Sequence, residues 1–548
     1  MAAYPDLDVL RVSVDALVER GDIPAAQRAM RPVVHAIALE DGPRFREFVT
    51  GLPPDLWHGD PVITSALGVS YRSAGSPPGA AALAYFRSAE AAIAASPEPV
   101  PAFCLIAVKA CHAGALRSQG RLADAAEMID EAARLLETEV KAPSFVAHSA
   151  RVSLETGVID LMLGRIDEAR ERLESAHGLA AHLTRAEQIE VMGCLALAAY
   201  AQGDLDASDR MIAEVEAASA PRAVMLSGFA SAYYAARILV MTDRYQLAGL
   251  SRVVADMVTA SVHTEWEPFA GVVGAYAKGL EGRPIEALDL LHRAAQGYLG
   301  WKPASIGRDI GELLRADLLS SIDRGEEAFG ILSVLDPHQR HALCPDRFIA
   351  RIALQHGDLH GADQALADCE LLGDGHSGRT LIDVQLLRAA IDLERGRPAL
   401  SDIAFDRALH AMARTGVRSP LRHVPPGILA RLTARALTRP RDDEERRILD
   451  RLAESTDGHD GGPESLSERE RLVLVYVQRE LTVAQIAAEL FISPNTVKTH
   501  LRRLYRKLGV ATREEAIRTA RSLGMHLDAS PGITRRSPAE WRTDPDEQ

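Results

Sequence analysis

A short pattern recurs about every forty residues through the first four hundred residues of the chain. A turn residue, Gly or the Asp of an Asp-Arg pair, is followed five positions later by Ala or Ser. The ten pairs are Gly21/Ala26, Gly75/Ala80, Gly120/Ala125, Gly164/Ala169, Gly203/Ser208, Asp243/Ala248, Gly282/Ala287, Asp323/Ala328, Gly357/Ala362 and Gly396/Ser401. Gly permits a tight turn between antiparallel helices, and a small side chain lets the second helix approach the first closely. The pattern therefore predicts a long array of helical hairpins.

Ala and Leu also recur at helical spacing, and runs of alternating β-branched residues are almost absent, so we expect an all-α chain. In the clearest unit a second small residue, Ala132, follows Gly120 and Ala125. This arrangement resembles the tetratricopeptide repeat, although the period is longer than that family's 34 residues and its aromatic positions are mostly missing. We expect a tetratricopeptide-like α-solenoid over residues 8–415, whose groove binds an unknown small-molecule or protein ligand.

Charge is distributed unevenly along the 548 residues. The whole chain has 62 Lys and Arg against 76 Asp and Glu, a net charge of −14, which argues against attraction of the whole chain to polyanions. Residues 464–526 carry eleven basic against seven acidic side chains, a net of +4, and the remainder carries 51 against 69, a net of −18. A nucleic-acid function therefore belongs to the C-terminal segment.

The composition around residue 455 indicates a boundary between domains. A charged helix is expected over 441–454, and the residues after it, 455–465, are rich in Gly, Asp, Ser and Pro, which is typical of a linker. We expect four parts: a repeat domain at 1–440, the charged helix and linker at 441–463, a small helical domain at 464–526, and a disordered tail at 527–548.

Helix start signals are clear in the small domain. Ser467 with Glu470, Thr482 with Gln485 and Thr512 with Glu515 have the spacing of capping boxes, in which two side chains satisfy amides at a helix N-terminus. Ser493 followed by Pro494 marks another start. The signals predict four helices, at 468–478, 483–490, 494–508 and 513–523.

The second and third of these helices have the pattern of a helix-turn-helix. Their apolar residues fall at spacings that bury one face of each helix against the other. On the third helix, Val497, Leu501, Leu504 and Leu508 are expected to point inward, which leaves a basic outer face. Residues 494–513 contain six basic residues and no acidic one.

Several motifs in this segment closely resemble the LuxR-type helix-turn-helix family. Leu-Ser-Glu-Arg-Glu at 466–470, Gln-Ile-Ala-Ala-Glu-Leu at 485–490 and Ser-Pro-Asn-Thr-Val-Lys-Thr-His at 493–500 occur in order at that family's separations. The resemblance covers about sixty residues. It implies a small four-helix domain that binds double-stranded DNA and regulates transcription.

The resemblance also implies roles for individual residues. Expected base contacts in the major groove are Lys498, Thr499 and Arg502. Expected phosphate contacts are Thr482, Thr496, Arg503, Arg506 and Lys507. His500 is either a further phosphate contact or a packed or solvent-facing side chain. The last helix, with Ala516, Ile517 and Ala520 as an apolar stripe, is expected to form the contact of a homodimer on DNA.

Two other motifs suggest ligand sites, but we favour a purely structural interpretation of both. Residues 373–380 match a phosphate-binding loop except that Arg379 replaces the Lys, but a helix rather than a strand is expected before them. His338, His341 and Cys344 have a spacing compatible with a metal site but lack a second cluster. We therefore expect no cofactor, no metal and no ATP-driven switch, and no catalytic arrangement stands out.

Together these features predict a cytoplasmic DNA-binding transcriptional regulator rather than an enzyme. The N-terminus lacks the pattern of a secretion signal, no apolar stretch is long enough for a membrane helix, and the five Cys are expected to be small buried side chains. RNA polymerase is a further expected partner, and no membrane contact is expected. The alternative is a protein-interaction scaffold without direct DNA binding. Operator, input signal and sign of regulation stay open.

Overall fold

The computed structural model describes residues 6–72, 80–97, 99–139, 146–301, 305–322, 324–335, 344–355, 357–372, 377–457, 468–479, 481–490, 494–508, 510 and 512–522. Within these ranges all regular structure is helical, which confirms the expected all-α class. None of the helices in this part of the chain is long and apolar enough to cross a membrane. The chain divides into two compact units, residues 1–449 and 450–548.

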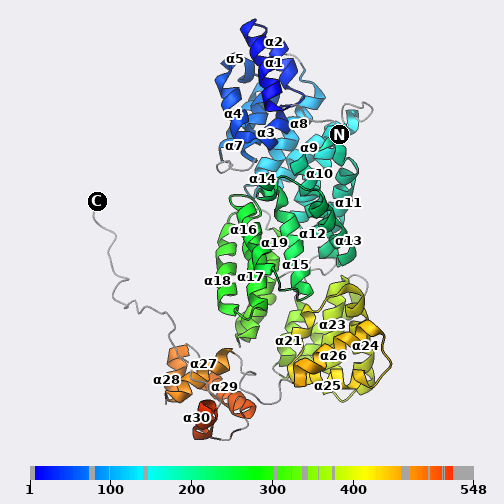
Figure 1. The fold of residues 1–548 in the computed structure, drawn as a ribbon, viewed down its shortest axis with the longest axis vertical. Helices are drawn as coiled ribbons and strands as arrows, with labels where there is room; N and C mark the ends of the chain where they lie inside the picture. The colour runs from blue at the N-terminus through cyan, green and yellow to red at the C-terminus, as the bar shows by residue number, and fades with distance from the viewer. Residues whose placement is uncertain are drawn as a thin grey trace, which may run out of the picture. The chain divides into compact units, whose positions relative to one another are not determined.

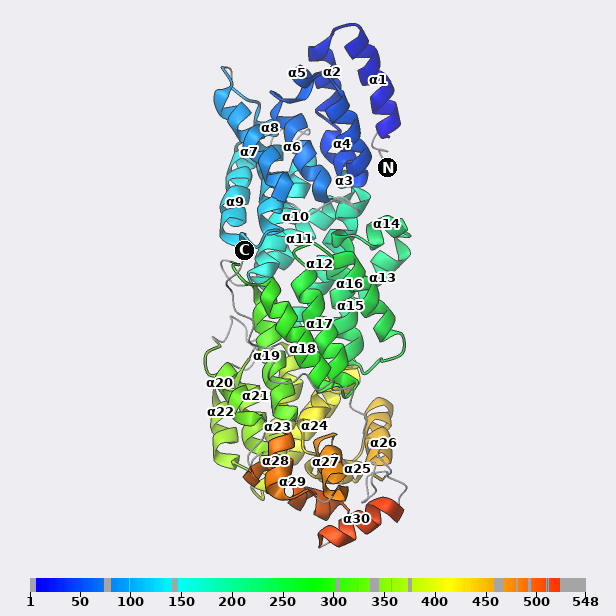
Figure 2. The same cartoon turned by 90° about the vertical axis from the view of Figure 1, so that its left-hand side faces the viewer.

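The first unit is the repeat array, and its hairpins are stacked in chain order (Figures 1 and 2). Its N-terminal part consists of α1 (Leu7–Glu19), α2 (Ile23–Met30), α3 (Val34–Glu40), α4 (Gly42–Gly51), α5 (Pro54–Trp57), α6 (Pro61–Val69), the 3₁₀ helix η1 (Ser70–Arg72) and α7 (Ala80–Ala95). The hairpins that follow are α8 (Ala102–Arg117) with α9 (Leu122–Glu139), α10 (Val146–Met162) with α11 (Ile166–Gly178), and α12 (Arg185–Gln202) with α13 (Leu205–Ala217).

The array continues through α14 (Arg222–Met225), α15 (Ser231–Asp243) with α16 (Leu250–Ser261), α17 (Glu267–Leu280) with α18 (Pro284–Gly297), α19 (Ile306–Ser321) with α20 (Gly325–Leu332), α21 (Asp346–Gln355) with α22 (Leu359–Leu372), and α23 (Gly378–Glu394) with α24 (Pro398–Thr415). It ends with the 3₁₀ helix η7 (Ser419–His423), α25 (Pro426–Leu437) and α26 (Asp443–Asp457). Residues 455–457, expected in the linker, are therefore helical, and the tail expected at 527–548 lies outside the described residues.

The turn pattern works as predicted in most hairpins. Seven of the turn glycines adopt positive φ between 70° and 80°, where an L side chain is strained: Gly21, Gly120, Gly164, Gly203, Gly282, Gly357 and Gly396. The small residues that follow are fully buried at Ala26, Ala125, Ala169, Ser208, Ala287, Ala328, Ala362 and Ser401. Asp323, the turn residue paired with Ala328, lies outside the described residues, and so do the side chains of the pair Gly75/Ala80.

The prediction for the remaining pair, Asp243/Ala248, was wrong. Ala248 is exposed, and α16 begins only at Leu250, after Gly249 in the left-handed conformation. Asp243 is completely buried and binds residues far along the chain, and the left-handed residue of the hairpin turn is Tyr245, two positions later, with a φ of 54°. The hairpin is therefore present, but its turn lies two residues later than the sequence pattern predicts.

The two helices of a hairpin differ in how they are buried. In α12 fourteen of the eighteen residues are buried, whereas in its partner α13 only five of thirteen are. A helix that is apolar on nearly all sides is covered on several faces, and an amphipathic helix has one face in solvent. The first helices of the hairpins therefore form the interior of the array.

The array also brings together segments that lie far apart in the sequence. The ring of Trp301 lies so close to Gly120 that a Cβ there would overlap it. A Cβ on Gly203 would lie 2.9 Å from the backbone nitrogen of Gly378. These contacts join the turns of the α8–α9 and α12–α13 hairpins to later segments, so the middle of the array encloses an interior space.

Burial of His35 on α3 predicts a measurable loss of stability in mild acid. Its Nε2 lies 2.9 Å from Ser65 Oγ, and burial, with the nearby Arg151, lowers the pKa of His35 from 6.5 to about 3. Below pH 6.5 the unfolded chain takes up a proton that the folded chain rejects, so stability falls as the pH falls. Between about pH 7 and pH 5 the native chain should lose about 2 kcal/mol more than His35→Gln.

Urea unfolding followed by circular dichroism at both pH values measures this difference. His58→Gln is the matched control because His58 is exposed. An equal pH response of the native chain and His35→Gln would contradict a neutral buried imidazole.

Candidate nucleic-acid interface

The second unit holds four short helices at the predicted positions. They are α27 (Glu468–Gln478), α28 (Val483–Leu490), α29 (Pro494–Lys507) and α30 (Arg513–Ser522). One hydrophobic core joins them, made of Val473, Leu474, Val477, Ile486, Ala487, Leu490, Val497, Leu501, Leu504, Leu508, Ala516 and Ala520. A single core of this size gives the segment its own compact fold.

Helices α28 and α29 pack as a helix-turn-helix. Ile486 and Leu490 on α28 and Val497 and Leu501 on α29 are buried in the shared core. Ala487 is also buried, and its small side chain allows the close crossing of the two helices. The apolar face predicted for α29 is confirmed at Val497, Leu501, Leu504 and Leu508.

Side-chain caps fix the starts of α28 and α30. The hydroxyl of Thr482 accepts from the Gln485 backbone N–H at 3.3 Å, while the Thr482 N–H donates to Gln485 Oε1 at 2.8 Å. Thr512 and Glu515 make the same reciprocal pair at the start of α30. Ser467 of the third predicted box lies outside the described residues. The caps orient α28, against which α29 packs.

The outer face of α29 carries the basic side chains expected to reach base edges. Lys498 and Arg502 are both exposed, and their separation of four residues places them on the same helix face, one turn apart. Thr499 lies in the same helix, but its side chain is not among those that the structure describes. Two long cationic donors on an exposed helix face have the reach and chemistry to bind guanine in the major groove.

The expected phosphate contacts are only partly visible. Thr496, Arg503, Arg506 and Lys507 lie on α29, and their side chains are outside the described set. Thr482 is exposed, but its hydroxyl also donates to Gln485 Oε1 at 2.9 Å. A phosphate contact by this hydroxyl would compete with the cap, so the role of Thr482 at phosphate remains a prediction.

The last helix and His500 are more deeply packed than their sequence suggested. Ala516 and Ala520 are fully buried within the domain and Ile517 is half-buried, so a second copy would have to meet α30 through its more exposed residues. His500 is only 2% exposed, which favours the packed role over a phosphate contact.

Arg513 has a role that the sequence did not reveal. Its Nη2 donates to the carbonyl oxygens of Val477 and Leu481, at 3.1 and 2.7 Å. These bonds tie the start of α30 to the end of α27. A basic residue that follows a capping Thr gives no local sign of such a distant carbonyl partner.

The two other motifs lie in the array. In the motif that resembles a phosphate-binding loop, residues 373–376 are outside the described residues. The motif follows α22, and its last residues, Gly378, Arg379 and Thr380, form the first turn of α23. No strand is described before the motif, and Arg379 binds Asp243.

Of the possible metal ligands, His338 and His341 lie outside the described part of the chain. Cys344 is buried, and its sulfur lies 3.2 Å from that of Cys369.

Residues 464–520 match the family model of bacterial regulatory proteins of the luxR family. This segment is therefore a LuxR-type helix-turn-helix domain, as its motifs predicted. Over 55 residues the chain is 51% identical to the probable transcriptional regulatory protein NarL of Mycobacterium tuberculosis strains H37Rv and CDC 1551. It is 47% identical over 58 residues to the HTH-type transcriptional regulator MalT of Serratia proteamaculans.

These similarities are confined to the C-terminal domain. The NarL match covers 10% of this chain and 26% of that protein, and the MalT match covers 11% of this chain and 6% of that protein.

Two solved structures align over most of this chain at low scores. The APC/C hetero-tetramer Cut9–Hcn1 covers 81% of this chain and 96% of its own, with 12% identity and a TM-score of 0.38; a human IFIT1 dimer with PPP-AAAA covers 75% and 91%, with 12% identity and a TM-score of 0.31.

The cap at Thr482 gives a prediction that separates a structural role from a phosphate contact. Thr482→Ala removes the acceptor for the Gln485 N–H and should destabilise α28 by about 1 kcal/mol. Amide hydrogen exchange of α28 in the full chain should then accelerate about fivefold, because exchange follows the free energy of local opening. Thr482→Ser, which keeps the hydroxyl, should exchange at the native rate. Unchanged exchange in Thr482→Ala together with weaker DNA binding would assign the hydroxyl to phosphate instead.

Proposed function

We propose that this chain is a cytoplasmic transcriptional regulator that binds specific double-stranded DNA through α28 and α29, under the control of a ligand or protein bound by the repeat array. The luxR-family match and the regulators NarL and MalT support the DNA-binding role of the C-terminal domain. We assign no catalytic role to the chain. RNA polymerase is the proposed partner of the DNA-bound form.

The observation that carries the proposal is the division of α29 into two faces. Val497 and Leu501 hold one face in the domain core, and the other face presents Lys498 and Arg502 to solvent. A helix fixed in this way has the geometry of a recognition helix, because its base-reading side chains are held outward by packing on the opposite side. Thr499 is proposed to lie with them.

The regulator is proposed to act as a homodimer on DNA. Two recognition helices at half-sites one helical turn apart raise the effective concentration of the second contact once the first has formed. Because Ala516 and Ala520 are used in the core, the proposed contact surface of α30 consists of Ile517 and its exposed neighbours Glu514 and Arg518.

Replacement of Lys498 or Arg502 by Ala should weaken binding to a selected duplex by about 1 to 3 kcal/mol and relax preference at one base pair. The duplex is obtained by selection from a random pool with the native chain, and affinities are measured by fluorescence anisotropy at fixed salt. The matched control is Arg210→Ala, which removes an exposed Arg of α13 and should leave the affinity unchanged. A loss that is equal for every duplex would assign that side chain to phosphate.

Salt dependence separates this function from the alternative, an interaction scaffold without direct DNA binding. DNA binding releases counterions, so the affinity of the full chain for duplex should fall about tenfold or more between roughly 50 and 200 mM salt if about three or more phosphates are contacted. Anisotropy measured over a series of salt concentrations gives the slope. A chain that binds no duplex at the lowest salt concentration supports the scaffold.

A further inference from the structure

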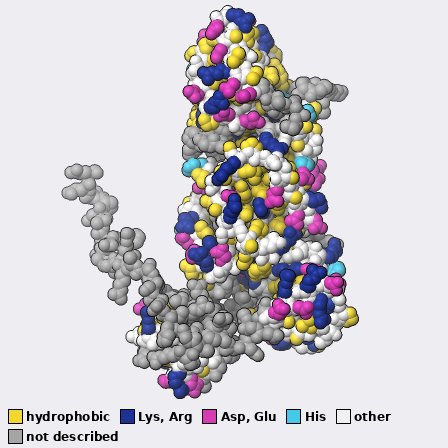
Figure 3. Space-filling view, in the orientation of Figure 1, with side chains coloured by type: hydrophobic (Ala, Val, Ile, Leu, Met, Phe, Trp, Pro, Cys, Tyr) yellow, Lys and Arg dark blue, Asp and Glu magenta, His cyan; other side chains and the backbone are white. Residues whose placement is uncertain are grey.

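An interior cavity lies in the middle of the array, where its distant segments come together. Its volume is about 150 Å³, and its wall is mainly apolar. The wall comes from the first helices of successive hairpins, with Leu161 on α10, Leu197 on α12, Leu239 on α15, Phe269 and Val272 on α17 and Leu314 on α19. In the space-filling view, hydrophobic side chains gather over this middle part of the array, with Lys and Arg beside them (Figure 3).

One end of the cavity is organised around the buried carboxylate of Asp243. It accepts hydrogen bonds from Tyr200 at 2.8 Å, Tyr276 at 3.3 Å and Ser419 at 2.8 Å. Arg379 completes the set, with its Nε 2.7 Å from Asp243 Oδ2. Burial raises the pKa of Tyr276 to about 12 and raises that of Tyr200 well above its usual value, so both phenols stay protonated as donors.

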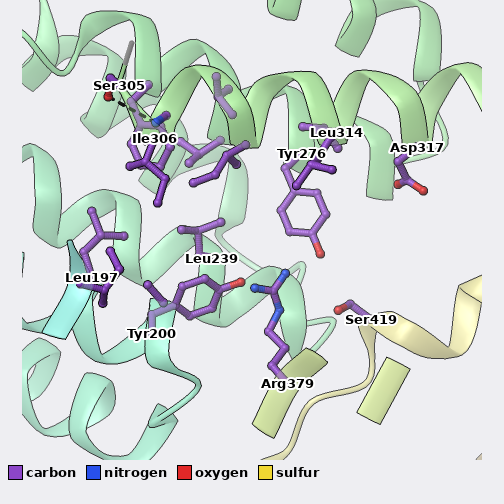
Figure 4. Close-up of a pocket in the computed structure, with 18 of the residues that line it drawn as sticks. Leu197, Tyr200, Leu239, Tyr276, Ser305, Ile306, Leu314, Asp317, Arg379 and Ser419 are labelled. Carbon is purple, nitrogen blue, oxygen red and sulfur yellow. Dashed lines mark hydrogen bonds between the residues drawn. The ribbon is translucent and has the colours of Figure 1, made fainter. Parts of the chain in front are cut away.

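Arg379 uses only one part of its guanidinium in this arrangement. Its Nε binds Asp243, and its Cζ lies 5.0 Å from the ring centre of Tyr200. Among the described residues its two Nη groups have no hydrogen-bond partner. Figure 4 shows the guanidinium reaching into the cavity between the hydroxyl ends of Tyr200 and Tyr276. Two parallel N–H donors on a planar fork match the two oxygens of a carboxylate.

The groups around Asp243 include more guanidiniums than carboxylates. Three carboxylates and four guanidiniums form the Arg–Asp network, defined by the ion pairs Arg379–Asp243, Arg422–Asp317, Arg351–Asp317 and Arg347–Asp383. Glu265, another acidic residue of the cavity wall, belongs to a separate cluster in which Arg72 and Arg117 face three glutamates, Glu155, Glu190 and Glu265. Within the Arg–Asp network itself one guanidinium has no carboxylate of its own, which is costly in an environment of low dielectric constant.

A second polar group in this cavity lacks a partner. His423 is 93% buried, and its Nδ1 lies 2.9 Å from Asp383 Oδ1. Burial lowers the pKa of His423, so the imidazole stays neutral at pH 7 and adds no charge to the network. Its Nε2 makes no hydrogen bond among the described residues, since the nearest carboxylate oxygen, on Asp317, is 3.9 Å away. Because Nδ1 donates to Asp383, Nε2 is an acceptor, and a buried acceptor without a partner is expected to bind water or a donor group of a ligand.

From these observations we propose that the cavity is the input site of the array and binds a small amphipathic carboxylate. The carboxylate lies against the Nη groups of Arg379 and balances the surplus charge of the Arg–Asp network. The apolar body occupies the space lined by Leu197, Leu239 and Phe269. A cavity of this volume with an aliphatic and aromatic wall accommodates a group the size of a benzene ring.

The proposed site is placed to influence the end of the array. Ser419, which binds Asp243, begins η7, and its neighbour Arg418 donates its backbone N–H to the Asp243 carbonyl at 2.7 Å. The side chain of Arg418 binds Glu444 on α26 at 3.3 Å. A ligand at Arg379 would thus be linked through Asp243 and Arg418 to α26, which precedes the DNA-binding domain in the chain. An effect on DNA binding rests on the proposed function, whereas ligand binding itself does not.

Calorimetric titration of the full chain without DNA tests the proposal. The probes are benzoate, phenylacetate and hexanoate, with benzamide and benzyl alcohol as uncharged probes of similar shape and inorganic phosphate as an anion without an apolar body. We expect binding of the carboxylates with an affinity about tenfold or more above that of the uncharged probes, because a hydrogen bond to a charged group is the stronger one.

Two variants separate the two parts of the site. Arg379→Gln should weaken carboxylate binding by about tenfold to a hundredfold while leaving the neutral donors Tyr200, Tyr276 and Ser419 on Asp243. Leu239→Phe keeps every charge but fills the cavity, and it should block all organic probes. Arg283→Gln, on an exposed residue paired with Glu286, is the matched control and should bind as the native chain does. Circular dichroism confirms that each variant is folded.

The outcomes are distinct. Four results would each overturn the proposal. They are the absence of carboxylate binding by the native chain, equal affinity for benzamide and carboxylate, unchanged carboxylate affinity in folded Arg379→Gln, and binding of any organic probe by folded Leu239→Phe. Lys498→Ala should still bind the carboxylate with native affinity. If the native chain binds carboxylate but no duplex, the proposed regulator function fails and the cavity assignment stands. If it binds duplex but no carboxylate, the cavity assignment fails and the proposed regulator function stands.

Discussion

The buried carboxylate of Asp243 is the interaction on which the middle of the array depends. It ends α15, and its donors Tyr200, Tyr276, Arg379 and Ser419 come from α12, α17, α23 and η7. The donor Ser419 is 176 residues away in the chain. An ionised group buried in this way is tolerated only because several donors replace its hydration. Asp243 therefore closes hairpins that neighbour contacts alone would leave stacked in an open row.

Local sequence signals predicted the parts of the structure that are local. A Gly at positive φ with a buried small residue five positions on defines a hairpin in most of the ten expected places, and the caps at Thr482 and Thr512 fix helix starts to the residue. These features involve neighbours in sequence, so composition and spacing are enough to reveal them. The exposure of Lys498 and Arg502 was predicted in the same way, because the inward face of α29 determines its outward face.

Features that depend on distant partners were not predicted. The contact of Trp301 with Gly120, the carbonyl partners of Arg513 and the ion pair of Asp243 join residues that no helical period connects. The sequence predicted Asp243 in a hairpin turn that lies two residues later, and it placed Arg379 in a loop-like motif for which we favoured a purely structural role. The two residues instead bind each other across more than a hundred positions of the chain, and a suggestive local pattern cannot reveal such a pair.

The energetics of the Arg–Asp network argue for function rather than stability. Burial of charges is costly, and well-packed apolar side chains of similar volume often stabilise a protein as much as a buried ion pair does. An array that needed only to be rigid would be served by an apolar interior at this point, as it has around Ile106 and Ile129. Instead four guanidiniums are paired with three carboxylates, and the buried Nε2 of His423 has no partner among the described residues. The side chain of Arg379 is 23% exposed, so its Nη groups are accessible to a ligand. The proposed anion would accept hydrogen bonds from the Nη groups of Arg379 and balance the extra guanidinium of the Arg–Asp network, so the free energy of ligand binding and the closure of the array at Asp243 would act on the same residues.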